Sequence, residues 1–174
     1  TTLVALAIAV QAGVPVLLWG PPGTGKSSAV VALAGQFGWL IETVIASLRE
    51  PADFTGLPVV TPDGVVLFAP SWAHRLAKVE RGILFFDELS LAAPATMAAL
   101  LRVVLERVVG DMALSQGISV IAAANPPEMA SNAWDITAPL ANRFCHIAWT
   151  LSAQDYADGI TNGWKYPALP ELPH

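Results

Sequence analysis

The sequence has one cysteine, Cys145, and few charged residues, which make up 13% of its 174 residues. A single cysteine cannot form an internal disulfide, which excludes a disulfide-stapled fold and favours a reducing, cytoplasmic location. The sequence contains nine lysine and arginine residues and 14 acidic residues, which give a net charge of −5. Because a non-specific grip on nucleic acid needs surplus positive charge, nucleic acid is not expected as a partner.

The first twenty residues are almost free of charge and are about as long as a membrane span. They begin without the basic residues of a signal peptide, and they contain Gln11 and the helix-breaking Gly13-Val14-Pro15. These features favour a helix, a turn and a buried strand. We therefore expect no membrane association.

Short apolar runs of strand length recur along the chain, and helix-length segments separate most of them. Runs without polar alternation are typical of parallel strands covered on both faces, which predicts an α/β fold with a five-stranded parallel sheet flanked by helices. The predicted strands are Val16–Trp19, Leu40–Val44, Ile83–Phe86, Ile118–Ala123 and Cys145–Trp149. Capping signals predict helices at Thr2–Gln11, Lys26–Phe37, Trp72–Arg81 and Ala95–Val108.

Two segments with turn residues at their centres interrupt this alternation and predict β-hairpin insertions at Pro58–Phe68 and Arg107–Leu114. After Trp149 the pattern changes. Ser152 and Asp155 resemble a capping box, which predicts a short helix before an irregular, proline-rich tail. We therefore divide the chain into a core domain, residues 1–150, and a terminal region, residues 151–174.

A glycine-rich stretch between the first strand and the next helix fits the phosphate-loop pattern G-x-x-x-x-G-K-[ST]. The backbone N–H groups of such a loop surround phosphate oxygens, Lys26 reaches the β- and γ-phosphates, and Ser27 offers its hydroxyl to Mg²⁺. ATP and Mg²⁺ are therefore the expected cofactors. The expected nucleotide-binding residues are Gly20, Pro21, Pro22, Gly23, Thr24, Gly25, Lys26, Ser27 and Ser28.

Asp87 and Glu88 end a hydrophobic strand at the edge where a parallel sheet binds its ligand. Adjacent strand residues point in different directions, so the two carboxylates can have two roles. We expect Asp87 to hold the magnesium ion and Glu88 to deprotonate the water that attacks the γ-phosphate. Hydrolysis of ATP is thus the expected reaction, and an ordinary acidic turn is the alternative.

Together with GPPGTGKS and FFDE, the stretches Ala122–Pro126 and Pro139–Phe144 make this chain resemble the AAA+ ATPases, a P-loop NTPase family, and within them the MoxR-like group. The resemblance implies that Asn125 is sensor 1, which aligns the attacking water, and that Arg143 is an arginine finger acting on a neighbouring subunit. It further implies a homo-oligomeric, hexameric ring whose pore is lined by the two hairpins. We expect the helical lid of the family to be largely missing after the core.

The MoxR-like resemblance implies chaperone-like remodelling of a protein client, and such proteins often act with a partner carrying a von Willebrand factor A domain. Two alternatives stay open. A nucleic-acid-directed, restriction-type motor would have all of these motifs, and a nucleotide-dependent scaffold would have the motifs that bind nucleotide. A GTPase-like switch is disfavoured, because Asn125 precedes prolines rather than the lysine and aspartate used to recognise guanine. The three histidines and six tryptophans are interpreted as packing or solvated residues.

Overall fold

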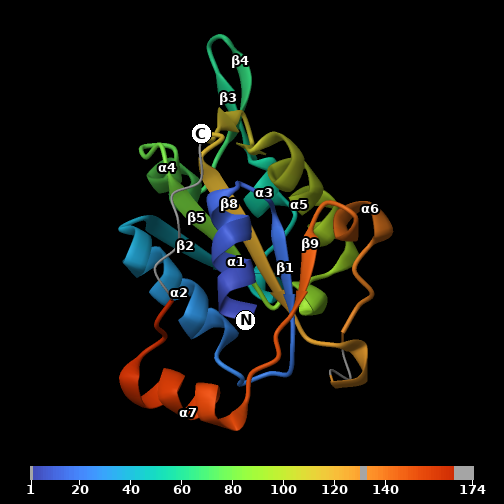
Figure 1. Ribbon diagram of the computed structural model, residues 1–174. Helices are drawn as coiled ribbons and strands as arrows, with labels where there is room; N and C mark the ends of the chain where they lie inside the picture. The colour runs from blue at the N-terminus through green and yellow to red at the C-terminus, as the bar shows by residue number, and fades with distance from the viewer. Residues whose placement is uncertain (1, 130–132, 167–174) are drawn as a thin grey trace.

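The computed structural model describes residues 2–129 and 133–166 and is built on a five-stranded parallel sheet (Figure 1). The strand order is β2-β5-β8-β1-β9. The predicted α/β fold with a parallel sheet is confirmed. The strands are β1 (Val16–Trp19), β2 (Leu40–Ile45), β5 (Gly82–Asp87), β8 (Ile118–Ala124) and β9 (Cys145–Ala148).

Helices cover both faces of the sheet, because alternate residues of its strands point to opposite sides. Ile83 and Phe85 of β5 belong to the core shared with α1 (Thr2–Gln11) and α2 (Lys26–Phe37). Leu84 and Phe86 belong to the other core. That second core also receives α3 (Ala52–Thr55), α4 (Ser71–Leu76), α5 (Pro94–Glu106) and α6 (Ala138–Ala141).

The two edge strands depart from the predicted burial on both faces. Only one of the six residues of β2 is fully buried, and most of β9 is exposed, including Cys145. The apolar runs therefore predict the positions of these two strands correctly. They do not predict how much of each strand is exposed to solvent. The short 3₁₀ turns between elements are η1 (Ala46–Leu48), η2 (Leu89–Leu91) and η3 (Pro127–Met129).

Two predicted helices end earlier than expected. The helix predicted at Trp72–Arg81 stops at Leu76, and tighter hydrogen bonds from Lys78 and Val79 to the carbonyls three residues back turn the chain toward β5. Helix α5 ends at Glu106, because Arg107 adopts a left-handed backbone conformation with φ 56°. The buried guanidinium of Arg107 donates to the backbone carbonyls of Val104 and Ile118, and burial lowers its pKa.

Both predicted hairpins are confirmed. The first, β3 (Leu57–Thr61) with β4 (Gly64–Phe68), projects from one end of the molecule (Figure 1). The second, β6 (Val108–Val109) with β7 (Met112–Ala113), is joined to the first through Asp111. The Asp111 carboxylate accepts from the Leu67 N–H at 2.7 Å, and the Asp111 N–H donates to the Leu67 carbonyl at 3.0 Å.

The predicted capping box is confirmed at the start of α7 (Ala153–Asn162). The Ser152 hydroxyl accepts from the Asp155 N–H at 3.1 Å, and the Asp155 carboxylate accepts from the Ser152 N–H at 3.3 Å. Residues 167–174 of the predicted tail lie outside the described residues. Among the helices that the structure describes, none is long and apolar enough to cross a membrane.

We expect Gly56→Ala to destabilise the fold, because Gly56 has φ 85° and a Cβ there would lie 2.8 Å from the Gly110 Cα. The strained backbone and the overpacking should lower the free energy of unfolding by about 1–3 kcal/mol. Gly35→Ala is the matched control, since Gly35 is within α2 and a Cβ there meets nothing within 4 Å.

The control should raise the free energy of unfolding by roughly 0.5–1 kcal/mol, because alanine favours a helix. Urea titration followed by circular dichroism measures both changes. An unfolding midpoint of Gly56→Ala equal to that of the unsubstituted chain would show that the two hairpins do not meet as closely as described.

Candidate functional site

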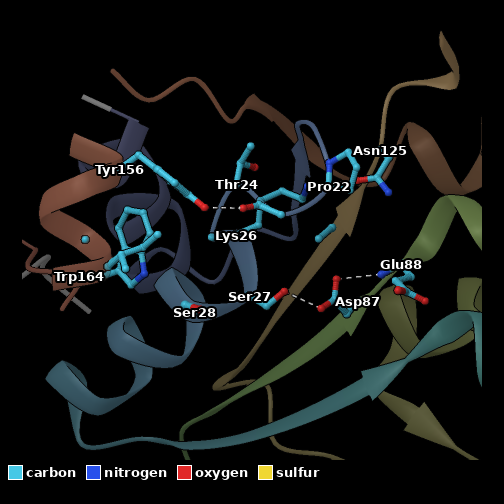
Figure 2. Close-up of a pocket in the computed structure, with 15 residues that line it drawn as sticks. Pro22, Thr24, Lys26, Ser27, Ser28, Asp87, Glu88, Asn125, Tyr156 and Trp164 are labelled. Atoms are coloured by element: carbon cyan, nitrogen blue, oxygen red, sulfur yellow. Dashed lines mark hydrogen bonds between the residues drawn. The ribbon is translucent and has the colours of Figure 1, made fainter. Parts of the chain in front are cut away.

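A pocket of about 600 Å³ opens where the carboxyl ends of the central strands meet α7 (Figure 2). The loop between β1 and α2 forms its floor. Asp87 and Glu88 lie on one side of it, and Tyr156 and Trp164 lie on the other. The full lining is Pro22, Gly23, Thr24, Gly25, Lys26, Ser27, Ser28, Asp87, Glu88, Ala123, Asn125, Tyr156, Gly159, Ile160 and Trp164.

Two glycines allow the loop to turn sharply into α2. Gly23 has φ 73° and Gly25 has φ 83°, a region that residues with a Cβ rarely adopt. Gly25 is also the N-cap of α2, so the unpaired N–H groups of the first helical turn and the positive end of the helix dipole lie at the pocket. This backbone favours an anionic ligand.

The ammonium group of Lys26 is held inside the loop. It donates to the carbonyls of Gly20 and Pro21, both at 2.7 Å, and to Asn125 Oδ1 at 3.2 Å. Lys26 is 7% exposed, and its burial lowers its pKa, while the negative charge of Asp87 acts in the opposite direction. The hydrogen bond to Asn125 links the end of β8 to the loop.

The two carboxylates have different partners. Asp87 Oδ2 accepts from the Ser27 hydroxyl at 2.6 Å, and Asp87 Oδ1 accepts from the Glu88 N–H at 2.9 Å (Figure 2). Glu88 is exposed, has a left-handed backbone with φ 56°, and accepts from the Ser47 hydroxyl at 2.5 Å. Both Asp87 oxygens are thus fixed, whereas Glu88 is directed toward η1.

Ser27 and Asp87 offer hydroxyl and carboxylate oxygens, the ligand type that Mg²⁺ prefers. Across the part of the chain that the structure describes, no group of three or more histidine, cysteine, aspartate or glutamate side chains could hold a metal alone. Magnesium usually keeps several waters and takes oxygens from bound phosphates. The residues present therefore fit a magnesium ion that arrives with a nucleotide.

Comparison with protein families gives a match over most of the chain. The family described as "ATPase family associated with various cellular activities (AAA)" matches residues 16–148. The chain belongs to this AAA family. The phosphate loop, the acidic pair and Asn125 of this AAA ATPase domain all lie within the matched residues.

Curated relatives match a shorter part of the AAA domain. RuvB of Synechococcus sp. (strain WH7803), a Holliday junction branch migration complex subunit, is 38% identical over 88 residues, which cover 46% of this chain and 24% of that protein. RuvB of Ligilactobacillus salivarius is 37% identical over 71 residues, which cover 40% of this chain and 21% of that protein. This chain thus spans about a quarter or less of these relatives.

Solved structures share the AAA fold. A structure from Cytophaga hutchinsonii, assigned as an ATPase, has a TM-score of 0.62 and 20% identity, covering 91% of this chain and 48% of that chain. A RuvB variant of Thermotoga maritima has a TM-score of 0.56 and 21% identity, covering 84% and 43%. The MoxR-like subgroup is not confirmed by these comparisons, and the expected lack of a nucleic-acid partner is not supported.

The structure brings most of the predicted site residues of the AAA domain together. Residues 22–28, Asp87, Glu88 and Asn125 line the pocket. Gly20 and Pro21 do not line it, but their carbonyls hold Lys26. Arg143 is exposed, follows α6 and is not part of the lining.

Sequence reasoning missed several contacts of this site. Ser47 reaches Glu88 because β2 and β5 pair in parallel, with Ile45 opposite Asp87. Ser90, which is 2% exposed, accepts from the Asn125 N–H at 3.2 Å. Residues of α7 line the pocket. Trp164 lines it as well, whereas the sequence predicts only a packing role for the tryptophans. No local motif marks Ser47 or Trp164, because only the tertiary fold brings them to the loop.

Proposed function

We propose that this AAA ATPase domain binds ATP together with Mg²⁺ and hydrolyses it. The observation that carries the proposal is the hydrogen bond between Ser27 and Asp87, the two proposed magnesium ligands, beside the phosphate loop. Lys26 would bind the β- and γ-phosphates, and residues 20–28 would surround them. A magnesium ion held by Ser27 and Asp87 would supply positive charge to a transferred phosphoryl group.

Glu88 is the proposed general base. It follows Asp87, is exposed and lines the pocket, and in the proposed complex its carboxylate would accept a proton from a water beside the γ-phosphate. Its left-handed backbone costs roughly 1 kcal/mol, and such strain is concentrated at functional sites. Asn125, fixed through its N–H by Ser90, would align the same water as sensor 1.

Arg143 is the proposed arginine finger of a neighbouring subunit. It is exposed and lies outside the pocket of its own chain, so its charge is available to another molecule. The proposed assembly is a hexameric ring in which each site is completed by the next subunit.

A mixing experiment on the full-length protein tests Glu88 and Arg143 together. Glu88→Gln and Arg143→Ala should each bind ATP and each lose about 10²-fold or more in turnover, because the base or the finger is gone. Mixed rings should regain part of the activity, since some interfaces pair an intact Glu88 with an intact Arg143. Phosphate release measures turnover, and tagged co-purification verifies mixing.

Glu80→Gln is the control for the loss of a carboxylate, because Glu80 is exposed and precedes β5 at the opposite end of that strand. Its turnover should equal that of the unsubstituted protein. Near-normal turnover of Glu88→Gln would reject Glu88 as the base. Verified mixed rings without any recovery would reject the action of Arg143 on its neighbour.

We further propose that the motor acts on a protein client in the manner of the MoxR-like group. The hairpin β3–β4 supports this, because it exposes Val60 at 84% and Val65 at 64%, and Asp63 is its single charged residue. A surface that follows a phosphate backbone needs lysine or arginine, which this hairpin lacks. A von Willebrand factor A domain partner belongs to the same proposal.

A DNA-directed motor is the second candidate. It is favoured by the RuvB relatives, which are Holliday junction branch migration complex subunits. The two candidates differ in the ligand that should accelerate turnover. An unfolded polypeptide would stimulate the first, and a four-way DNA junction would stimulate the second.

We expect an unfolded polypeptide to raise the ATP turnover of the full-length protein and a DNA junction to leave it unchanged at low salt. Val60→Asp should abolish the stimulation without changing basal turnover, because it places a charge on the apolar hairpin. Val14→Asp, in an exposed turn, is the control and should keep the stimulation. Stimulation by the junction alone would favour the DNA-directed motor.

A further inference from the structure

The outer side of the phosphate loop is covered by the segment that follows β9. A Cβ on Gly20 would lie 2.8 Å from the Cβ of Trp149, and a Cβ on Gly25 would collide with the ring of Trp164. Trp149 and Trp164 pack edge to face, with their ring centroids 6.0 Å apart. The loop is therefore in contact with this aromatic segment at both of its ends.

Two side chains of this segment donate hydrogen bonds to loop carbonyls. The indole N–H of Trp149 donates to the Thr24 carbonyl at 3.0 Å. The hydroxyl of Tyr156 donates to the Gly23 carbonyl at 2.9 Å (Figure 2). Trp149 is 3% exposed, so its ring is fixed by packing. Tyr156 is on α7, whose start is fixed by the capping box.

Holding a carbonyl also orients the N–H of the same peptide unit. A trans peptide is planar, and its C=O and N–H groups point in opposite directions. The Thr24 N–H therefore points away from Tyr156, and the Gly25 N–H points away from Trp149. Gly23, Thr24 and Gly25 line the pocket, so the N–H groups of Thr24 and Gly25 belong to the part of the loop that would meet a phosphate.

Glycine-rich peptide units change orientation at low cost, and Gly23 and Gly25 flank the units concerned. Donors that are already oriented bind an anion without first having to be ordered. We propose that Trp149 and Tyr156 are positioning residues of the nucleotide site, which keep the N–H groups of Gly25 and Thr24 directed at the phosphates. This inference rests on the proposed ATP-binding function.

The test compares two pairs of variants that lose the same chemical group at different places. Trp149→Phe and Tyr156→Phe remove the donors to the loop and keep an aromatic ring. In the controls, Trp19→Phe removes an indole N–H that donates to His146 Nδ1 at 3.0 Å, and Tyr166→Phe removes a hydroxyl that donates to the Ala29 carbonyl at 2.9 Å. Burial raises the pKa of Tyr166, which keeps its hydroxyl a donor.

Affinities for Mg·ATP and for inorganic tripolyphosphate with Mg²⁺ are measured by calorimetric titration. Trp149→Phe and Tyr156→Phe should each lower the affinity for both ligands by about threefold to tenfold, which is the usual effect of losing one neutral hydrogen bond. The controls should bind both ligands as the unsubstituted chain does. Urea titration of all four variants shows whether a change in stability accompanies a change in affinity.

Amide NMR measures the chemical-shift changes of individual loop N–H groups, which a loss of stability alone would not alter. On addition of tripolyphosphate, the Gly25 resonance should shift less in Trp149→Phe, and the Thr24 resonance should shift less in Tyr156→Phe. Weaker ATP binding with unchanged tripolyphosphate binding would overturn the inference, because the side chains would then contact the nucleoside. Equal weakening in the controls would also overturn it.

Failure of the proposed function gives a different result. In that case the unsubstituted chain would bind neither ATP nor tripolyphosphate, and both proposals would fall together. If the unsubstituted chain binds both ligands and Trp149→Phe and Tyr156→Phe bind them equally well, the ATP-binding proposal stands and the positioning inference is rejected.

Discussion

The alignment of the carboxyl ends of three parallel strands is the constraint on which the site depends. Trp19 of β1 lies opposite Ala124 of β8, and Phe86 of β5 lies opposite Ala122. The residues that follow these strands therefore meet at one edge, where the phosphate loop, Asp87 and Asn125 come together. A slip of one residue in this register would turn each carboxylate to the other face of the sheet.

Some features of this edge are unfavourable for the free energy of folding. The nearly buried Lys26 and the left-handed Glu88 lie within one pocket. Their cost is offset by the packed sheet, whose central strands β5 and β8 are almost completely buried. A ligand with phosphate groups would relieve part of it, because Lys26 and the loop N–H groups would gain an anionic partner.

Much of this arrangement could be predicted from the sequence, because its signals are local. Gly25 and Lys26 belong to a contiguous motif between a strand and a helix, and Asp87 ends a continuous apolar run. The remaining contacts are not local. Ser47 reaches Glu88 only through the β2–β5 register, and Trp149 reaches Thr24 across 125 residues of sequence. The end of α5 was also missed, since its determinant is the buried contact of Arg107 with β8.

Equilibrium dialysis of labelled ATP against the unsubstituted chain, with Mg²⁺ and then with EDTA, tests the central claim most directly. The account predicts saturable binding of a single ATP per chain, with a lower affinity in EDTA, because the Asp87 carboxylate, which accepts from the Ser27 hydroxyl, can favour an anionic nucleotide only through a bound metal ion. No saturable binding, or the same affinity with and without the metal, would contradict it.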